Sequence, residues 1–240
     1  MRRASLLVML ALVSFAALAH AETNAAATLI PFDSLTVTNR TLVRSVTDHY
    51  TLRREYDARE FHASKQHLDY LMDHLDACSV LSEAAGLIQY RATRDAQGRF
   101  FADNHEGARG YIVEAYSGGG KRIYYVQGTE QGVFKVEGRG VAVINYGQTS
   151  TNTIRYTGAM FVKVDNVVIA ALAQLFGVFV QGTVDHHFNH VLHHPIKLSE
   201  MALSDPQLLL DKIRQMPEPD HTLLVPFAEL LHPDTNNLAR

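Results

Sequence analysis

The segment Val133–Val164 reads VFKVEGRGVAVINYGQTSTNTIRYTGAMFVKV, and its pattern decides the fold. Apolar and polar residues alternate with a period of two in both halves, and the polar segment Gly147–Asn152 lies between them. This pattern predicts two long antiparallel strands joined by a turn. One face of the first strand carries apolar side chains and two glycines, namely Phe134, Val136, Gly138, Gly140, Ala142, Ile144 and Tyr146. Because glycine has no side chain to pack, glycines on an inner face allow a long sheet to bend sharply.

Shorter β patterns precede this pair, with turn residues between them. They cover Ile88–Arg94, Arg99–Ala102, Tyr111–Tyr116 and Lys121–Gln127. The connections are short, which favours antiparallel pairing between neighbours. We therefore expect an antiparallel meander of about six strands from Leu87 to Val164.

Two further segments lie upstream of the meander. Thr36–Tyr56 is rich in Thr, Val, Leu and Tyr and predicts a strand. In Ala58–Ala85, apolar residues recur at spacings of three and four, which predicts an amphipathic helix, or two short helices with a bend. Polar residues between them predict a solvated face, made of His67, Asp69, Asp73, His74 and Asp76. Gly86 is a natural end for this helical region.

A long apolar helix is predicted after the meander. Asp165 is suited to begin it, and Val167–Val180 contains one polar residue, Gln174. This stretch is too short to span a bilayer. We expect the helix to continue to His194, where Pro195 would end it. Beyond it, Ser204-Asp205-Pro206 predicts the start of another short helix, and His221–Arg240 is expected to be a loosely attached tail.

The predicted order is a strand, a helix, about six antiparallel strands and a long apolar helix. From about Thr41 to His194, this order resembles the helix-grip fold of the START-like and polyketide-cyclase-like superfamily. The resemblance implies an α+β fold in which a curved antiparallel sheet wraps a long C-terminal helix around an apolar cavity. It also implies binding of a lipid or another apolar molecule, as in most members, or catalysis, as in a minority. That superfamily has no short diagnostic motif, so no catalytic residue is assigned.

The chain begins with the three-part layout of a secretory signal peptide. Met1–Arg3 is basic, Leu6–Leu18 is an apolar run broken only by Ser14, and Ala19-His20-Ala21 supplies small residues for cleavage. The run is shorter than the roughly 20 residues that a spanning helix needs. We expect cleavage after Ala21 and an exported protein, periplasmic or secreted, with a retained anchor as the alternative.

This reading divides the chain into three parts. Residues 1–21 form the signal peptide, residues 22–195 the helix-grip ligand-binding domain, and residues 196–240 a helical or extended C-terminal extension.

The content of charged residues and cysteine limits which partner molecules and which covalent cross-links are expected. The 240 residues carry 22 Lys+Arg and 25 Asp+Glu, a net charge of −3. Removing residues 1–21 leaves 20 basic against 25 acidic residues, a net charge of −5, which disfavours nucleic acid as a partner. Cys78 is the single cysteine, so no intrachain disulfide can form, and its helical pattern predicts burial.

Candidate ligand-binding residues come from the apolar faces of the two long strands and the long helix. They are Phe134, Val136, Ile144, Tyr156, Met160, Leu172, Phe176 and Phe179. Such a cavity holds its ligand through buried area, with few polar contacts. Tyrosines are the expected polar groups, since each offers apolar area and one hydroxyl; they are Tyr111, Tyr124, Tyr125, Tyr146 and Tyr156. Glu114, Glu137 and Arg139 are expected on the outer face.

Five of the twelve histidines that follow the signal peptide lie between His186 and His194. His186, His190 and His194 stand at i, i+4 and i+8, and pairs at that spacing can share a metal ion. The alternative is a polar rim at the end of the helix, where positive charge is favoured. A third interpretation is a response to mild acid, because imidazoles titrate near ~6.5.

The sequence therefore predicts an exported, non-enzymatic binding protein for a lipid or other apolar molecule, suited to lipid carriage with transient membrane contact. No cofactor is expected in this class. The alternative is a metal-assisted hydrolase or cyclase that uses zinc or a similar ion at His186, His190 and His194. A third class is a structural protein whose cavity is simply a filled core.

Overall fold

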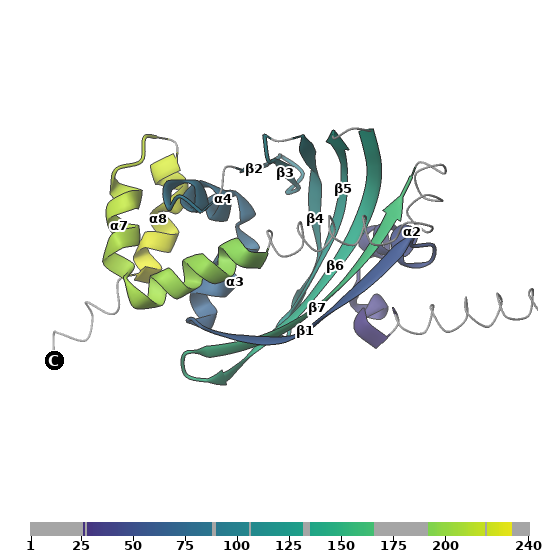
Figure 1. Ribbon diagram of the computed structural model, residues 1–240, viewed down its shortest axis with the longest axis horizontal. Helices are drawn as coiled ribbons and strands as arrows, with labels where there is room; N and C mark the ends of the chain where they lie inside the picture. Colours follow the sequence, from purple (N-terminus) through teal and green to yellow (C-terminus); the bar gives the residue numbers. More distant parts are fainter. Residues whose placement is uncertain are drawn as a thin grey trace, which may run out of the picture.

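The computed structural model describes residues 26, 28–87, 90–105, 107–131, 135–165, 192–218 and 220–231. They contain a seven-stranded antiparallel sheet, strongly curved, with strand order β1-β7-β6-β5-β4-β3-β2 (Figure 1). The strands are β1 (Leu52–His62), β2 (Arg91–Arg94), β3 (Phe100–Asp103), β4 (Ala108–Gly118), β5 (Lys121–Gln131), β6 (Lys135–Ser150) and β7 (Thr153–Val164). The expected α+β class with a curved antiparallel sheet is confirmed. The predicted long helix at Val167–Val180 lies outside the described residues.

Three glycines on adjacent strands bring the backbones of the sheet unusually close together. Gly110 pairs with Gly128, and Gly128 pairs with Gly138. A Cβ atom on Gly128 would lie 2.6 Å from the Arg109 carbonyl oxygen, and one on Gly138 would lie 3.1 Å from that of Lys163. A Cβ atom on Gly110 or Gly128 would overlap a carbonyl oxygen, and one on Gly138 would be tightly placed, so this glycine row lets the sheet bend where the sequence predicted bending.

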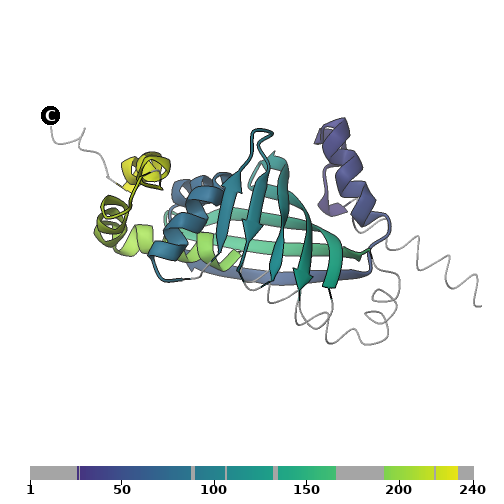
Figure 2. The same cartoon turned by 90° about the horizontal axis from the view of Figure 1, so that it is seen from above.

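The convex face of the sheet is covered by residues 28–35 and by α2 (Val37–Thr47), which the views in Figures 1 and 2 place away from the other helices. Val43 and Val46 are fully buried in the same apolar cluster as Val141 and Phe161. The strand predicted for Thr36–Tyr56 is therefore wrong over Val37–Thr47. Thr36 caps this helix by accepting a hydrogen bond from the Asn39 backbone N–H (3.2 Å), and packing on the sheet overrides the β preference of its branched residues.

Two short helices follow β1, as one of the alternatives for this region predicted. They are α3 (Lys65–Asp73) and α4 (Leu75–Ala84), and His74 interrupts them with a non-helical backbone at φ −126° and ψ 69°. The helical region begins later than predicted because β1 continues to His62. Gly86 adopts a positive φ of 72°, the left-handed conformation common after a helix.

The C-terminal residues form helices that pack against α4. They comprise residues 192–204, α7 (Pro206–Arg214) and α8 (Asp220–Leu231). They share one apolar core with α4, which includes Cys78, Leu81, Leu198, Ala202, Leu209, Ile213, Leu224 and Phe227. As predicted, Asp205 begins α7: its Oδ1 accepts from the Leu208 backbone N–H at 3.1 Å, and Pro206 takes the first helical position.

Two expectations for this region are wrong. Pro195 does not end a helix, because residues 192–204 are helical around it and its carbonyl oxygen accepts the Ser199 hydroxyl at 2.6 Å. The expected loose tail is packed over residues 221–231, since the apolar face of α8 buries Leu224 and Phe227 completely. Within the described part of the chain, no helix has the length and apolarity needed to cross a membrane.

The glycine row generates a first prediction. Gly128→Ala is expected to lower the free energy of unfolding by about 1–3 kcal/mol, because the new methyl group overlaps the backbone of β4. Gly147→Ala is the control: a Cβ atom there meets nothing within 4 Å, so stability should change little. Urea unfolding monitored by far-ultraviolet circular dichroism measures both. Equal stability of the two variants would contradict a close approach at Gly128.

A second prediction concerns α8. Phe227→Ala is expected to cost about 3–5 kcal/mol of folding free energy, because it leaves a cavity in the core shared with α4. Val225→Ala on the same helix should stay within about 0.5 kcal/mol, since Val225 is 39% exposed. If both substitutions were neutral in thermal and urea unfolding, α8 would not be part of the cooperative fold.

Candidate functional site

An apolar pocket lies on the concave face of the sheet, beneath α3 and the start of helical residues 192–204. Its walls are Phe61, Leu68, Met72, Ile144, Tyr146, Tyr156, Leu192 and Ile196. The described residues enclose a cavity of about 10 Å³, which is close to the volume that one water molecule needs. Every side chain that lines it is apolar or a tyrosine.

Strand alternation explains how the floor of this pocket arises. In β6, Ile144 and Tyr146 point to the concave side, whereas Val141 and Val143 belong to the cluster under α2. Tyr146 pairs directly with Tyr156 across β7. The Tyr156 ring packs edge-to-face against Phe61 of β1, with 5.9 Å between ring centroids, which closes the floor at the sheet edge.

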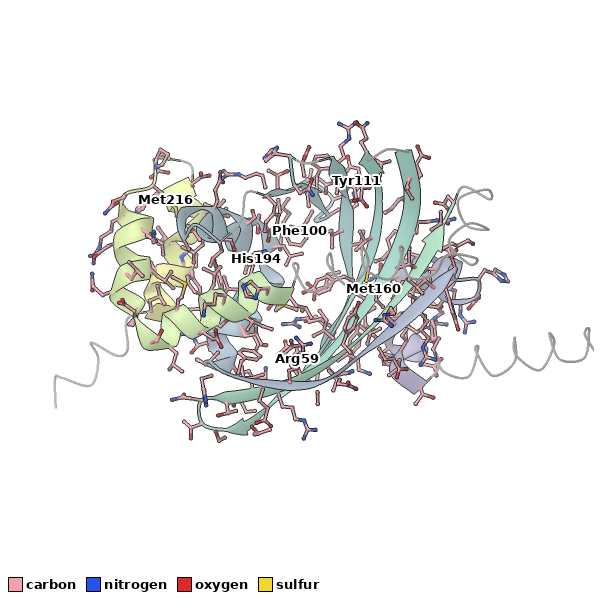
Figure 3. All side chains as sticks on the ribbon, in the orientation of Figure 1. Arg59, Phe100, Tyr111, Met160, His194 and Met216 are labelled. Carbon is pink, nitrogen blue, oxygen red and sulfur yellow. The ribbon has the colours of Figure 1, made fainter. Side chains whose placement is uncertain are left out.

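The structure places part of the predicted ligand-binding set around this pocket. Ile144 and Tyr156 line it, and Met160 packs on the same apolar cluster, directly opposite Ala142 (Figure 3). Val136 pairs with Glu130, toward the opposite end of β6 from the pocket. The remaining predicted residues lie outside the described residues, namely Phe134, Leu172, Phe176 and Phe179.

The contribution of α3 and of residues 192–196 to the pocket was not predicted from the sequence. Leu68 and Met72 were recognised as an apolar helix face, but the pattern did not show which side of the sheet that face covers. Leu192 and Ile196 come from a segment predicted to end at Pro195. No local signal identifies the contacts of these residues with β6 and β7, because they join segments that lie far apart in the sequence.

A charged cluster adjoins the pocket between α3 and the sheet. Arg122 of β5 is only 6% exposed, and its Nη2 lies 2.8 Å from Asp73 Oδ1 and 3.8 Å from Asp69 Oδ1. The Tyr146 hydroxyl donates to Asp69 Oδ1 at 2.6 Å. Lys65 Nζ donates to Asp69 Oδ2 at 2.5 Å. Asp69 thus contacts Arg122, Lys65 and the Tyr146 hydroxyl, and Asp73 contacts Arg122.

Burial also alters the titration of groups in this cluster. It raises the pKa of Tyr124, whose hydroxyl donates to the Met72 carbonyl oxygen at 2.9 Å. Burial and the hydrogen bond to Asp69 raise the pKa of Tyr146, so both phenols are neutral donors. Burial raises the pKa of the Glu114 carboxyl, an effect that nearby Asp73 reinforces and Arg122 opposes.

This cluster corrects two expectations. Asp69 and Asp73 do not form a solvated face, because both turn toward Arg122 on the sheet. Glu114 lies on the concave face rather than the outer one, since it pairs with Tyr124 across β5. Among the tyrosines, Tyr124, Tyr146 and Tyr156 face the concave side, whereas Tyr111 and Tyr125 stand at odd positions on the convex side. Arg139 is on the convex side, as expected, and pairs with Asp165.

The structure describes only one residue of the predicted metal set. His186 and His190 lie outside the described residues. His194 is 2% exposed among the helices, and its ring centroid lies 5.6 Å from that of Tyr90 (Figure 3). In the described ranges, no group of three His, Cys, Asp or Glu residues is placed to hold a metal ion. The metal site stays a prediction.

Two other side chains, those of His67 and Cys78, are packed within the helical part of the molecule. His67 is not on a solvated face: its Nε2 lies 3.1 Å from the Leu230 carbonyl oxygen, and its ring packs on Phe227. Cys78 is fully buried, as predicted, and burial raises the pKa of its thiol to about 12. A protonated, enclosed thiol is neither a nucleophile nor a ready metal ligand.

The chain was compared with known proteins and solved structures. No protein-family model matches it, and no curated protein matches its sequence. Among solved structures, a conserved protein from Geobacillus kaustophilus is 14% identical, with a TM-score of 0.43, and the match covers 61% of this chain and 96% of that protein. The protein XoxI from Bacillus cereus is 13% identical with a TM-score of 0.38, covering 61% and 94%.

A third match is a START superfamily protein from Mycobacterium smegmatis. It is 10% identical with a TM-score of 0.40, and the match covers 61% of this chain and 97% of that protein. The likeness concerns the fold, because identities at this level say nothing of ligand or chemistry.

Proposed function

We propose that this chain binds an apolar small molecule against the concave face of its curved sheet. The observation that carries the proposal is the pocket between the sheet, α3 and residues 192–196, whose walls are entirely apolar or tyrosine. Concave sites of this composition are the usual place for small-molecule ligands, and their affinity comes mainly from buried apolar area.

The apolar surface continues beyond the pocket along the sheet. Ile112, Ala142 and Met160 border the same cluster and are only partly buried. Covering the remaining apolar surface would stabilise a complex by about 25 cal/mol for each Å² removed from water. The floor therefore offers a ligand more contact area than the present cavity encloses.

Entry of a ligand requires movement at the roof of the pocket. The enclosed space of about 10 Å³ is far below the roughly 300–1,000 Å³ of sites for drug-sized molecules. The floor belongs to the paired strands of the sheet, whereas the roof is made by side chains of α3 and by Leu192 and Ile196. We propose that the roof moves away from the sheet when a ligand enters.

The absence of tryptophan makes a direct test of this proposal available. Phe61→Trp places one fluorophore in the pocket wall, and 1-bromooctane should quench its emission, because a bromine atom quenches at contact. Glu60→Trp is the matched control, since Glu60 is the neighbouring residue on β1 and is exposed. We expect saturable quenching in the first variant only. Equal quenching in both, or none in either, would refute binding at the pocket.

We further propose that the protein is exported and carries its apolar ligand between membranes. The support is the signal-peptide layout of residues 1–21 and the mildly acidic remainder of the chain. Transient membrane contact would then be the step at which the ligand enters or leaves.

Export generates a further prediction. Intact-mass analysis of the protein from its own host is expected to show a chain that begins at Glu22. Ala21→Tyr removes the small residue at the cleavage position and should leave the uncleaved precursor. Recovery of the wild-type chain with Met1 still attached would contradict this proposal.

A further inference from the structure

Arg122 carries a buried hydrogen-bond donor beside the apolar pocket. Its Nε is buried and has no hydrogen-bond partner in the described part of the chain. Ile144, which lines the pocket, is its direct cross-strand partner, and its guanidinium carbon lies 6.0 Å from the ring centroid of Tyr146, another lining residue. A buried donor left without an acceptor costs free energy, so an acceptor supplied by a ligand would be favoured there.

The neighbouring phenols are already engaged. The Tyr146 hydroxyl donates to Asp69, and the Tyr124 hydroxyl donates to the Met72 carbonyl oxygen. The other charged nitrogen in this cluster, Lys65 Nζ, donates to Asp69. Arg122 Nε is thus a buried donor of this cluster that can take a new acceptor without breaking an existing bond between described residues.

The local charge decides which kind of acceptor fits. The positive charges of Arg122 and Lys65 are balanced by Asp69 and Asp73, which lie 3.8 and 2.8 Å from Arg122 Nη2. An anionic ligand would stand close to these two carboxylates and would be repelled by them. A neutral oxygen adds no charge and still accepts the N–H bond.

We propose that Arg122 binds a neutral oxygen at one end of the apolar ligand, through a hydrogen bond from its Nε–H. The ligand class is then an uncharged apolar molecule that ends in a hydroxyl or carbonyl group, rather than a fatty acid anion. This inference rests on the proposed function, because it assigns the polar end of a ligand held in the same pocket.

The test uses the mature chain with Phe61→Trp and three probes of equal chain length. The probes are 1-bromooctane, 8-bromo-1-octanol and 8-bromooctanoate, each followed by tryptophan quenching at neutral pH. Arg122→Lys keeps the charge that Asp73 requires but removes the Nε–H group. It is expected to weaken binding of the alcohol about tenfold, as for loss of a hydrogen bond to a charged group, and to leave bromooctane within about twofold. Arg155→Lys, on the exposed opposite face, should change neither.

A second variant guards against a local defect in folding. The double substitution Arg122→Gln with Asp73→Asn removes both partners of the pair, so no buried charge is left alone. We expect the same selective loss of alcohol binding, with a melting curve that remains cooperative.

The possible outcomes distinguish a failure of this inference from a failure of the proposed function. Selective loss of alcohol binding in both variants supports a hydrogen bond from Arg122. The inference is overturned if alcohol binding is unchanged in the Arg122 variants. It is also overturned if 8-bromooctanoate binds more tightly than the alcohol to the protein that keeps Arg122. In either case, quenching by bromooctane would still support binding at the pocket. Absence of quenching by all three probes overturns the proposed function itself, and this inference with it.

Discussion

The close approach of backbones at Gly110, Gly128 and Gly138 is the constraint on which the rest of the structure depends. A Cβ atom on Gly128 would meet the carbonyl oxygen of the paired strand at 2.6 Å, so this close approach requires glycine there. The bend gives the sheet one concave and one convex face. Each face then buries a different set of apolar residues, under α3 on one side and under α2 on the other.

The concave face combines an apolar pocket with a buried charge, and these impose different physical demands. Apolar walls gain free energy from contact area in any orientation, whereas Arg122 requires acceptors at defined positions. Asp69 and Asp73 supply them from α3, and this helix also supplies Leu68 and Met72 to the pocket. Arg122 is buried while both aspartates remain partly exposed, and these ion pairs tie α3 to the sheet.

The C-terminal helices give the pocket its second wall. Their own core is shared with α4, and α4 follows α3 after the break at His74. Residues 192–204 extend from this core to the sheet, where Leu192 joins the apolar cluster of the pocket. The helical core and the ligand surface are therefore continuous, and a change in helix packing would be felt at the pocket.

Local chemistry was sufficient to predict several elements from the sequence. Alternation with a period of two identified the long strands β6 and β7, since half-buried strands need it. Asp205 and Pro206 marked the start of α7, and the apolar spacing over α3 and α4 predicted helix, either as one helix or as two with a bend. Each of these features depends on residues within a few positions of one another, which is why the sequence alone determined them.

Long-range contacts decided the rest. Val37–Thr47 has branched residues that favour a strand, yet the free energy of burying Val43 and Val46 under the convex face makes it helical. Asp69 and Asp73 resemble solvent-facing residues in the helix pattern, and only the partner strand shows that Arg122 binds them. The sequence by itself thus determined the elements and the apolar character of the site. Only the tertiary structure decided which faces meet, because burial and charge pairing depend on residues far apart in the chain.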